Sequence, residues 1–230
     1  MLYLTLPIRG SFESSLLGLA KSFSERTGIE CELIIGSSGK LTAQITEGAP
    51  YDVFVSANLK YPETVFENGF ADEPPRVYAL GKLVLWSVKK DIKPSLESLK
   101  EPSVKHIALA NPKTAPYGQA AVEVLKHFEI FDAVNDKLVY GESIAQTNQF
   151  IISKSAEVGF TAMSVVRSPQ MKNEGFWKEI DPKYYAPIEQ GIVVIQRKNR
   201  DISKAQQFRD FLFSTTAKQI LKDFGYLTNE

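Results

Sequence analysis

Four short loops of small and polar residues precede helix-like stretches and carry most of the chemical information in the sequence. Ser11 lies in "RGSFESSL", Ser38 in "GSSGKL", Tyr117 in "PKTAPYGQAAVE" and Ile144 in "YGESIAQTNQF". The first backbone N–H groups of a helix have no partner inside the helix, and the helix dipole favours negative charge there. Serine hydroxyls add donors, and glycine lets an anion approach the backbone closely. Four such helix starts around one point would suit a small oxyanion with several acceptor atoms.

Each loop taken alone has a simpler interpretation, and two other motifs can be tested by their spacing. Capping of a helix by Ser37 or Ser38 is common, so only the recurrence of the loops favours anion binding. A nucleotide-binding P-loop would need glycine where Ile34 stands and a hydroxyl residue where Leu41 follows Lys40. The nearest match to a hydrolase nucleophile turn, "GESIA", lacks the final glycine. Both enzyme motifs are therefore disfavoured.

The composition excludes several further classes. Lys plus Arg and Asp plus Glu number 27 each, so no basic excess favours nucleic acid. His106 and His127 are the only histidines, and a catalytic or metal-binding role for either is a minor alternative. Cys31 is the only cysteine, so no internal disulfide can form. Apolar runs such as 191–195 are too short to span a bilayer.

The elements that must position the four loops follow an alternating α/β order. Strand patterns at 2–8, 30–36 and 52–57 alternate with helix patterns at 12–28 and 40–48. In the first helix Leu16, Leu19, Ala20 and Phe23 share one face, and Gly28 ends it. This order predicts an open parallel sheet with helices on both faces, where ligands bind at the carboxyl ends of the strands.

A second α/β unit begins near residue 76. It consists of a β-rich stretch at 76–89, strands at 106–112 and 137–142, helices at 117–131 and 144–156, and a strand followed by a short helix within 157–166. A strand at 191–196 and one amphipathic helical stretch at 203–225 complete the chain. We expect lobe I to contain residues 1–79 and 191–230 and lobe II residues 80–190. Crossings near 78–86 and 186–194 would form a hinge beside a cleft.

The run "GSSGKLTAQITEGAPYDVFVSA" resembles the periplasmic molybdate-binding proteins of ABC transporters. The similarity extends through "YPETVFENGF", "ALGKLVLWS", "IALANPKTAPYGQAAVEVL", "GESIAQTNQFI" and "AEVGFTAMS", and so covers most of the chain. The resemblance implies the two-lobed type II periplasmic binding protein fold, with an open mixed sheet flanked by helices in each lobe and a ligand cleft between the lobes. It also implies molybdate or tungstate as ligand, a membrane permease as partner and no enzyme activity.

The resemblance also implies a set of ligand residues. Ser11 and Ser38 would each give a backbone N–H and a hydroxyl, Tyr117 an N–H and its phenol, and Ile144 an N–H alone. Members that have a further tyrosine carry it at the position of Ala162. The residues expected just behind these donors are Arg9, Gly10, Ser37, Gly118 and Ser143. No cofactor is implied, and no metal beyond the centre of the oxyanion.

Arg9 departs from the family pattern, which usually has two small residues before the first donor. If Arg9 faces the anion, its charge could relax selectivity toward sulfate or phosphate. If it faces solvent or pairs with Glu13, the site keeps neutral donors only. An effector-sensing domain of a regulator and an enzyme on the same fold are the remaining alternatives, although no helix-turn-helix or acid–base constellation is recognisable.

The cellular location depends on the resemblance, since the residues alone fit either side of the membrane. "MLYLTLPIRGSF" lacks the features of a signal peptide. A protein of this family would be periplasmic or lipid-anchored outside the cytoplasmic membrane, its signal segment lying outside this sequence. We expect a monomer whose lobes close on the anion and which is then recognised by the permease.

Overall fold

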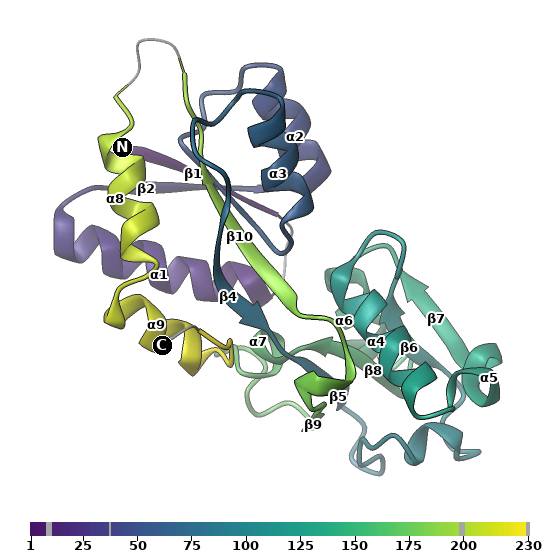
Figure 1. Ribbon diagram of the computed structural model, residues 1–230. Coiled ribbons are helices and arrows are strands. Elements are labelled where there is room, and N and C mark those ends of the chain that lie inside the picture. The colour runs from purple at the N-terminus through teal and green to yellow at the C-terminus, as the bar shows by residue number, and fades with distance from the viewer. Residues whose placement is uncertain (8–10, 37, 198–200, 229–230) are drawn as a thin grey trace. The chain divides into compact units, whose positions relative to one another are not determined.

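The computed structural model describes residues 1–7, 11–36, 38–197 and 201–228, and it divides the chain into two compact units (Figure 1). Unit 1 comprises Met1–Leu80 and Glu189–Glu230, and unit 2 comprises Gly81–Ile188. The chain thus leaves unit 1 once and returns to it once. Arg9, Gly10 and Ser37 lie outside the described residues.

Unit 1 is built on a five-stranded mixed sheet with the order β2-β1-β3-β10-β4. Its strands are β1 (Leu2–Pro7), β2 (Cys31–Gly36), β3 (Val53–Ser56), β4 (Arg76–Gly81) and β10 (Ile188–Val194). β1 runs parallel to both β2 and β3, as the β-α-β-α-β pattern predicts. β10 enters antiparallel to β3, which makes the sheet mixed.

Helices cover both faces of the unit 1 sheet because side chains alternate along β3. Val53 and Val55 pack in a core with α1, α8 and α9, whereas Phe54 packs on the opposite face with α2 and α3. Leu16, Leu19 and Phe23 of α1 are at most 1% exposed, as their shared face predicts. These helices are α1 (Ser11–Thr27), α2 (Ser38–Thr46), α3 (Lys60–Glu67), α8 (Ser203–Phe211) and α9 (Thr215–Asp223).

Unit 2 is also built on a five-stranded mixed sheet, with the order β7-β6-β8-β5-β9. Its strands are β5 (Leu83–Ser87), β6 (Ile107–Ala110), β7 (Leu138–Gly141), β8 (Val158–Ala162) and β9 (Phe176–Glu179). β6 is parallel to β7 and β8, and β5 is antiparallel to β8 and β9. The α-helices are α4 (Pro116–His127), α5 (Phe131–Val134), α6 (Ile144–Ile152) and α7 (Met163–Val166).

The structure corrects several element predictions. The helical stretch predicted at 203–225 is two helices, because the Ser214 hydroxyl accepts a hydrogen bond from the Ala217 N–H at 3.2 Å and starts α9 anew. The helix predicted at 117–131 is interrupted after His127, where Glu129 has φ +55°. Helix α3 and strand β9 were missed. All four side chains of β9 are exposed, so the strand carries no alternating apolar signal.

Candidate functional site

In unit 1 the starts of α1 and α2 follow neighbouring parallel strands. Pro7 at the end of β1 lies opposite Gly36 at the end of β2. The two helices begin at Ser11 and Ser38. Because parallel strands present their carboxyl ends at one edge, both helix starts belong to the same edge of this sheet. Ser11 is thus the first helical residue, and its side chain lies outside what the structure describes.

The side chain of Ser38 is buried against a second serine that the sequence did not single out. Ser38 is 9% exposed, and its Oγ lies 3.4 Å from the Oγ of Ser56, which is fully buried. Ser56 ends β3, the other parallel neighbour of β1, so a third strand end contributes to the same edge. The Ser38 carbonyl accepts a hydrogen bond from the Thr42 hydroxyl at 2.8 Å. A hydroxyl at the end of "DVFVS" is the signal that could have found Ser56.

Unit 2 repeats this arrangement with β6 and β7. Ala110 and Gly141 end these parallel neighbours in register, and the Asn111 N–H donates to the Gly141 carbonyl at 2.7 Å. Helix α4 follows β6 and helix α6 follows β7. The predicted donors Tyr117 and Ile144 therefore belong to one edge of the unit 2 sheet, as Ser11 and Ser38 do in unit 1.

Helix α4 begins without a side-chain cap. Its N-cap residue is Ala115, and Pro116 has no N–H, so Tyr117 carries the first backbone N–H of the helix. The Tyr117 side chain is 7% exposed and packs in the apolar core of unit 2. Gly118 lets this turn lie against the end of β6, since a Cβ there would be 2.0 Å from the Ala110 carbonyl oxygen. Any other residue would push α4 away from the strand.

The start of helix α6 is capped by side-chain hydrogen bonds. The Ser143 hydroxyl accepts from the Gln146 N–H at 3.3 Å, and the Gln146 side-chain oxygen accepts from the Glu142 N–H at 2.7 Å. This reciprocal pattern resembles a capping box. Ile144 is the first residue of the helix, so no carbonyl within α6 can accept from its N–H. Ala162, which ends β8, offers no phenol at the position where other members have tyrosine.

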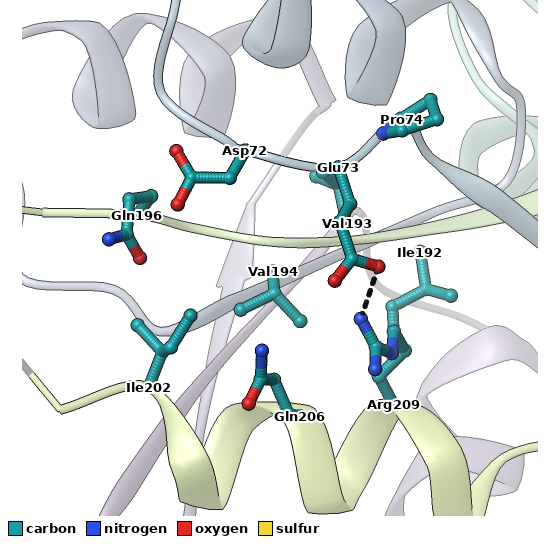
Figure 2. Close-up of a pocket in the computed structure, with 10 residues that line it drawn as sticks. All are labelled: Asp72, Glu73, Pro74, Ile192, Val193, Val194, Gln196, Ile202, Gln206 and Arg209. Carbon is teal, nitrogen blue, oxygen red and sulfur yellow. Dashed lines mark hydrogen bonds and ion pairs between the residues drawn. The ribbon is translucent and has the colours of Figure 1, made fainter.

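A separate pocket in unit 1 is chemically unsuited to an anion. It lies between residues 72–74, β10 and α8, and its volume is about 70 Å³ (Figure 2). Among the described residues that line it, Arg209 is the only cationic side chain, and it already binds Glu73 at 2.7 Å and Asp210 at 2.9 Å. Asp72 adds another carboxylate at its rim. The described lining residues thus carry more negative than positive charge, which disfavours a dianion.

Both histidines contact other side chains of unit 2. His106 Nδ1 lies 3.6 Å from the buried carboxylate of Glu157. The His127 ring contacts Phe128 edge-on and Tyr184 in a tilted arrangement. Within the described ranges, no three His, Cys, Asp or Glu side chains gather where they could hold a metal ion. Over the same residues, no helix has the length and apolar character needed to cross a membrane.

Comparison with known proteins defines the class. Residues 4–227 match the family model described as bacterial extracellular solute-binding protein. The chain is 37% identical over 221 residues to the molybdate-binding protein ModA of Azotobacter vinelandii, covering 95% of this chain and 87% of that protein. The ModA of Rhodobacter capsulatus is 34% identical, with 96% and 86% covered. The chain belongs to the bacterial extracellular solute-binding proteins.

A solved structure supports the same assignment. The periplasmic molybdate-binding protein of Azotobacter vinelandii superposes with a TM-score of 0.87 and 33% identity over the full length of both chains. Together with the mixed, helix-flanked sheets of both units, this confirms the prediction of a type II periplasmic binding protein fold. The proteins it resembles are solute-binding components of transport systems rather than enzymes.

Proposed function

We propose that this protein binds molybdate or tungstate outside the cytoplasmic membrane and delivers it to the permease of an ABC transporter. The observation that carries the proposal is the pairing of helix starts on adjacent parallel strands in both units, in a chain 37% identical to a protein named for molybdate binding. The ligand residues of the proposal are Ser11, Ser38, Tyr117 and Ile144. Arg9, Gly10, Ser37, Gly118 and Ser143 stand next to them in sequence.

The chemistry of the donors suits a tetrahedral dianion. Molybdate is fully ionised at neutral pH and has acceptor oxygens only, so N–H and O–H donors satisfy it without any proton transfer. The N–H groups of Tyr117 and Ile144 and the Ser38 hydroxyl are neutral donors at helix starts, where the dipole also favours negative charge. The proposal therefore includes no catalytic step and no cofactor.

Selectivity for molybdate would have two sources: the site lacks an acceptor for the proton of phosphate, and its donors are spaced for an anion larger than sulfate. Hydrogen phosphate carries a proton that needs an acceptor, and leaving that O–H unpaired would cost about 1–3 kcal/mol. Sulfate matches molybdate in charge and shape but is smaller, so some donors would stand too far from its oxygens. Each lost hydrogen bond costs a similar free energy. These costs add over several donors, so the affinity for molybdate would exceed that for sulfate by a large factor.

Release to the permease would follow from domain movement. The chain passes between the units at Leu80–Gly81 and at Ile188–Glu189. We propose these crossings as a hinge, with one anion taking donors from both units, so that the bound form differs in shape from the empty form. A monomer suffices for this role.

Calorimetric titration of anion-free protein with molybdate, tungstate, sulfate, phosphate and chromate tests the proposal. We expect one anion bound per chain, with molybdate and tungstate tight and sulfate weaker by orders of magnitude. Tight sulfate or phosphate binding with none of the heavy pair would refute the proposed ligand and make Arg9→Ala the next variant. Small-angle scattering with and without molybdate would test the change of shape.

A further inference from the structure

Three polar side chains form a short chain behind the start of α2. The Ser38 hydroxyl lies 3.4 Å from the Ser56 hydroxyl, which in turn lies 3.4 Å from the side-chain oxygen of Asn58. Ser56 is fully buried, so its hydroxyl has protein groups as its neighbours. The Ser38–Ser56–Asn58 group thus links the proposed anion donor to the loop that follows β3.

The direction of the protons in this group follows from its chemistry. The Asn58 Oδ1 also accepts from the Tyr61 N–H at 3.5 Å, which identifies it as the carbonyl oxygen of the amide. A carbonyl oxygen cannot donate, so Ser56 donates to Asn58. Serine has a single hydroxyl proton, and therefore Ser38 must donate to Ser56 as long as Ser56 donates to Asn58.

In this resting arrangement the Ser38 hydroxyl donates to Ser56 and not to the ligand, which does not suit anion binding. Molybdate has only acceptors, so Ser38 must turn its proton from Ser56 toward the ligand. We propose that Ser56 is a positioning residue whose hydroxyl turns when the Ser38 hydroxyl turns. The hydrogen bond between them then runs the other way: Ser56 donates to Ser38, and Ser38 donates to the anion. In this second state the Asn58 side-chain oxygen still accepts the hydrogen bond from the Tyr61 N–H, so it is not left unpaired. The inference rests on the proposed function, and it adds a residue that acts through Ser38.

The distances favour such an exchange. At 3.4 Å both contacts are longer than the 2.7–2.8 Å typical of hydroxyl hydrogen bonds, so the resting bonds are weak and easily given up. In the bound state Ser38 would donate a charge-assisted bond while accepting one from Ser56, and bonds linked in this way polarise each other. Ser56 would therefore strengthen Ser38 as a donor without touching the anion.

A double-mutant cycle tests this coupling by calorimetric titration with molybdate. We expect Ser56→Ala to weaken binding about three- to ten-fold and Ser38→Ala about ten-fold. The variant with both substitutions should bind no more weakly than Ser38→Ala alone, because Ser56 acts only through the Ser38 hydroxyl. Losses that multiply in the double variant would overturn the inference, and so would a Ser56→Ala variant with unchanged affinity.

Two further variants separate this role from a purely structural one. Asn58→Ala removes the competing acceptor, so Ser56 can donate to Ser38 at once, and affinity should be retained or raised; a loss there would contradict the relay. Ser56→Thr keeps the hydroxyl and should restore affinity to within about two-fold of wild type. Asn58 is only partly buried, which makes its truncation tolerable if Ser56→Ala fails to fold.

Ser87→Ala is the matched control. Ser87 is also fully buried and ends a strand, and its hydroxyl donates to the Glu157 carbonyl at 2.6 Å in unit 2. This substitution should lower the melting temperature and leave molybdate affinity unchanged. Failure of the wild-type protein to bind molybdate would overturn both proposals, whereas tight wild-type binding without coupling in the cycle would overturn the relay alone.

Discussion

The start of α4 in unit 2 and the start of α2 in unit 1 are positioned by different means. In unit 2 the backbone itself is packed tightly: Gly118 lies against Ala110, and a Cβ on Gly141 would be 2.7 Å from the Thr147 hydroxyl. In unit 1 the start of α2 has hydroxyl contacts: the Ser38 hydroxyl lies 3.4 Å from that of Ser56, and the Thr42 hydroxyl donates to the Ser38 carbonyl. We therefore expect substitution of Gly118 to damage the start of α4, whereas loss of hydroxyls should damage the start of α2.

Gly118→Ala should give the largest effect. The new Cβ would meet the backbone of Ala110 at 2.0 Å, so the start of α4 must shift and take the Tyr117 N–H with it. We expect a loss of about 1–3 kcal/mol of stability from overpacking. Molybdate affinity should fall about ten- to hundred-fold because the backbone donor at Tyr117 is displaced. Thermal unfolding and calorimetry measure the two quantities.

Gly39→Ala provides the matched control in unit 1. A Cβ on Gly39, in the first turn of α2, would approach only Tyr61 at 3.6 Å, an ordinary contact. This variant should bind molybdate normally and gain up to about 1 kcal/mol of helix stability. If it lost as much affinity as Gly118→Ala, the contrast between the units would be wrong.

Glu157→Gln should have the next largest effect, on the stability of unit 2. This buried carboxylate accepts hydrogen bonds from Lys89 Nζ at 2.9 Å and from the N–H groups of Lys105 and His106 at 3.0 and 2.7 Å. Burial raises the pKa of Glu157, but these hydrogen bonds outweigh it and lower the pKa from 4.5 to about 2. We expect Glu157→Gln to cost about 2–3 kcal/mol at pH 7.

The pH dependence gives this prediction its sign. Because the pKa of Glu157 is lower in the folded protein, its contribution is complete above about pH 4.5 and is lost as the pH falls toward 2. Calorimetric unfolding of both proteins across this range should show their difference in stability shrinking with acidity. A constant difference would mean that packing rather than charge holds Glu157.

Ser38→Ala probes the hydroxyl half directly and should cost about 1–2 kcal/mol of binding free energy, or roughly ten-fold in affinity. The backbone N–H of residue 38 remains, so binding should persist. Titration with molybdate and tungstate would measure the same loss for both anions if the hydroxyl is a common donor. No loss for either would remove the Ser38 side chain from the site.

Tyr117→Phe is the smallest expected effect and the sharpest test of unit 2. The Tyr117 ring packs in the apolar core, and phenylalanine would fill the same space. If unit 2 binds the anion through backbone N–H groups, affinity should change less than about two-fold. A ten-fold loss would show that the phenol donates and would make the two halves more alike than we infer.

The sequence was most informative where periodicity and local chemistry agree. The buried face of α1 was predictable because Leu16, Leu19 and Phe23 recur at helical spacing. The breaks at Glu129 and Ser214 were not, since apolar residues continue on both sides of each. A positive φ marks the first break and a hydroxyl cap the second. β9 is held by backbone pairing to the core strand β5, which its exposed side chains do not record in an alternating pattern.

The positions of the helix starts were also predictable from local sequence order, whereas the residues that pack against them were not. Strand-loop-helix order places Ser38 and Ile144 at sheet edges without any knowledge of tertiary contacts. Ser56 follows Ser38 by many residues, and only the pairing of β1 with β3 brings them together. The need for glycine at position 118 likewise depends on how closely α4 approaches β6.

The topology of unit 1 has a consequence for synthesis on the ribosome. β10 lies between β3 and β4 in the sheet, yet it is made only after all of unit 2 has been translated. Until then β3 and β4 have no partner on their facing edges, whereas unit 2 is one uninterrupted segment that can fold as it emerges. A nascent chain should thus become protease-resistant in its middle first. Exposed strand edges near its beginning would await the returning strand, and chaperone demand should peak during that interval.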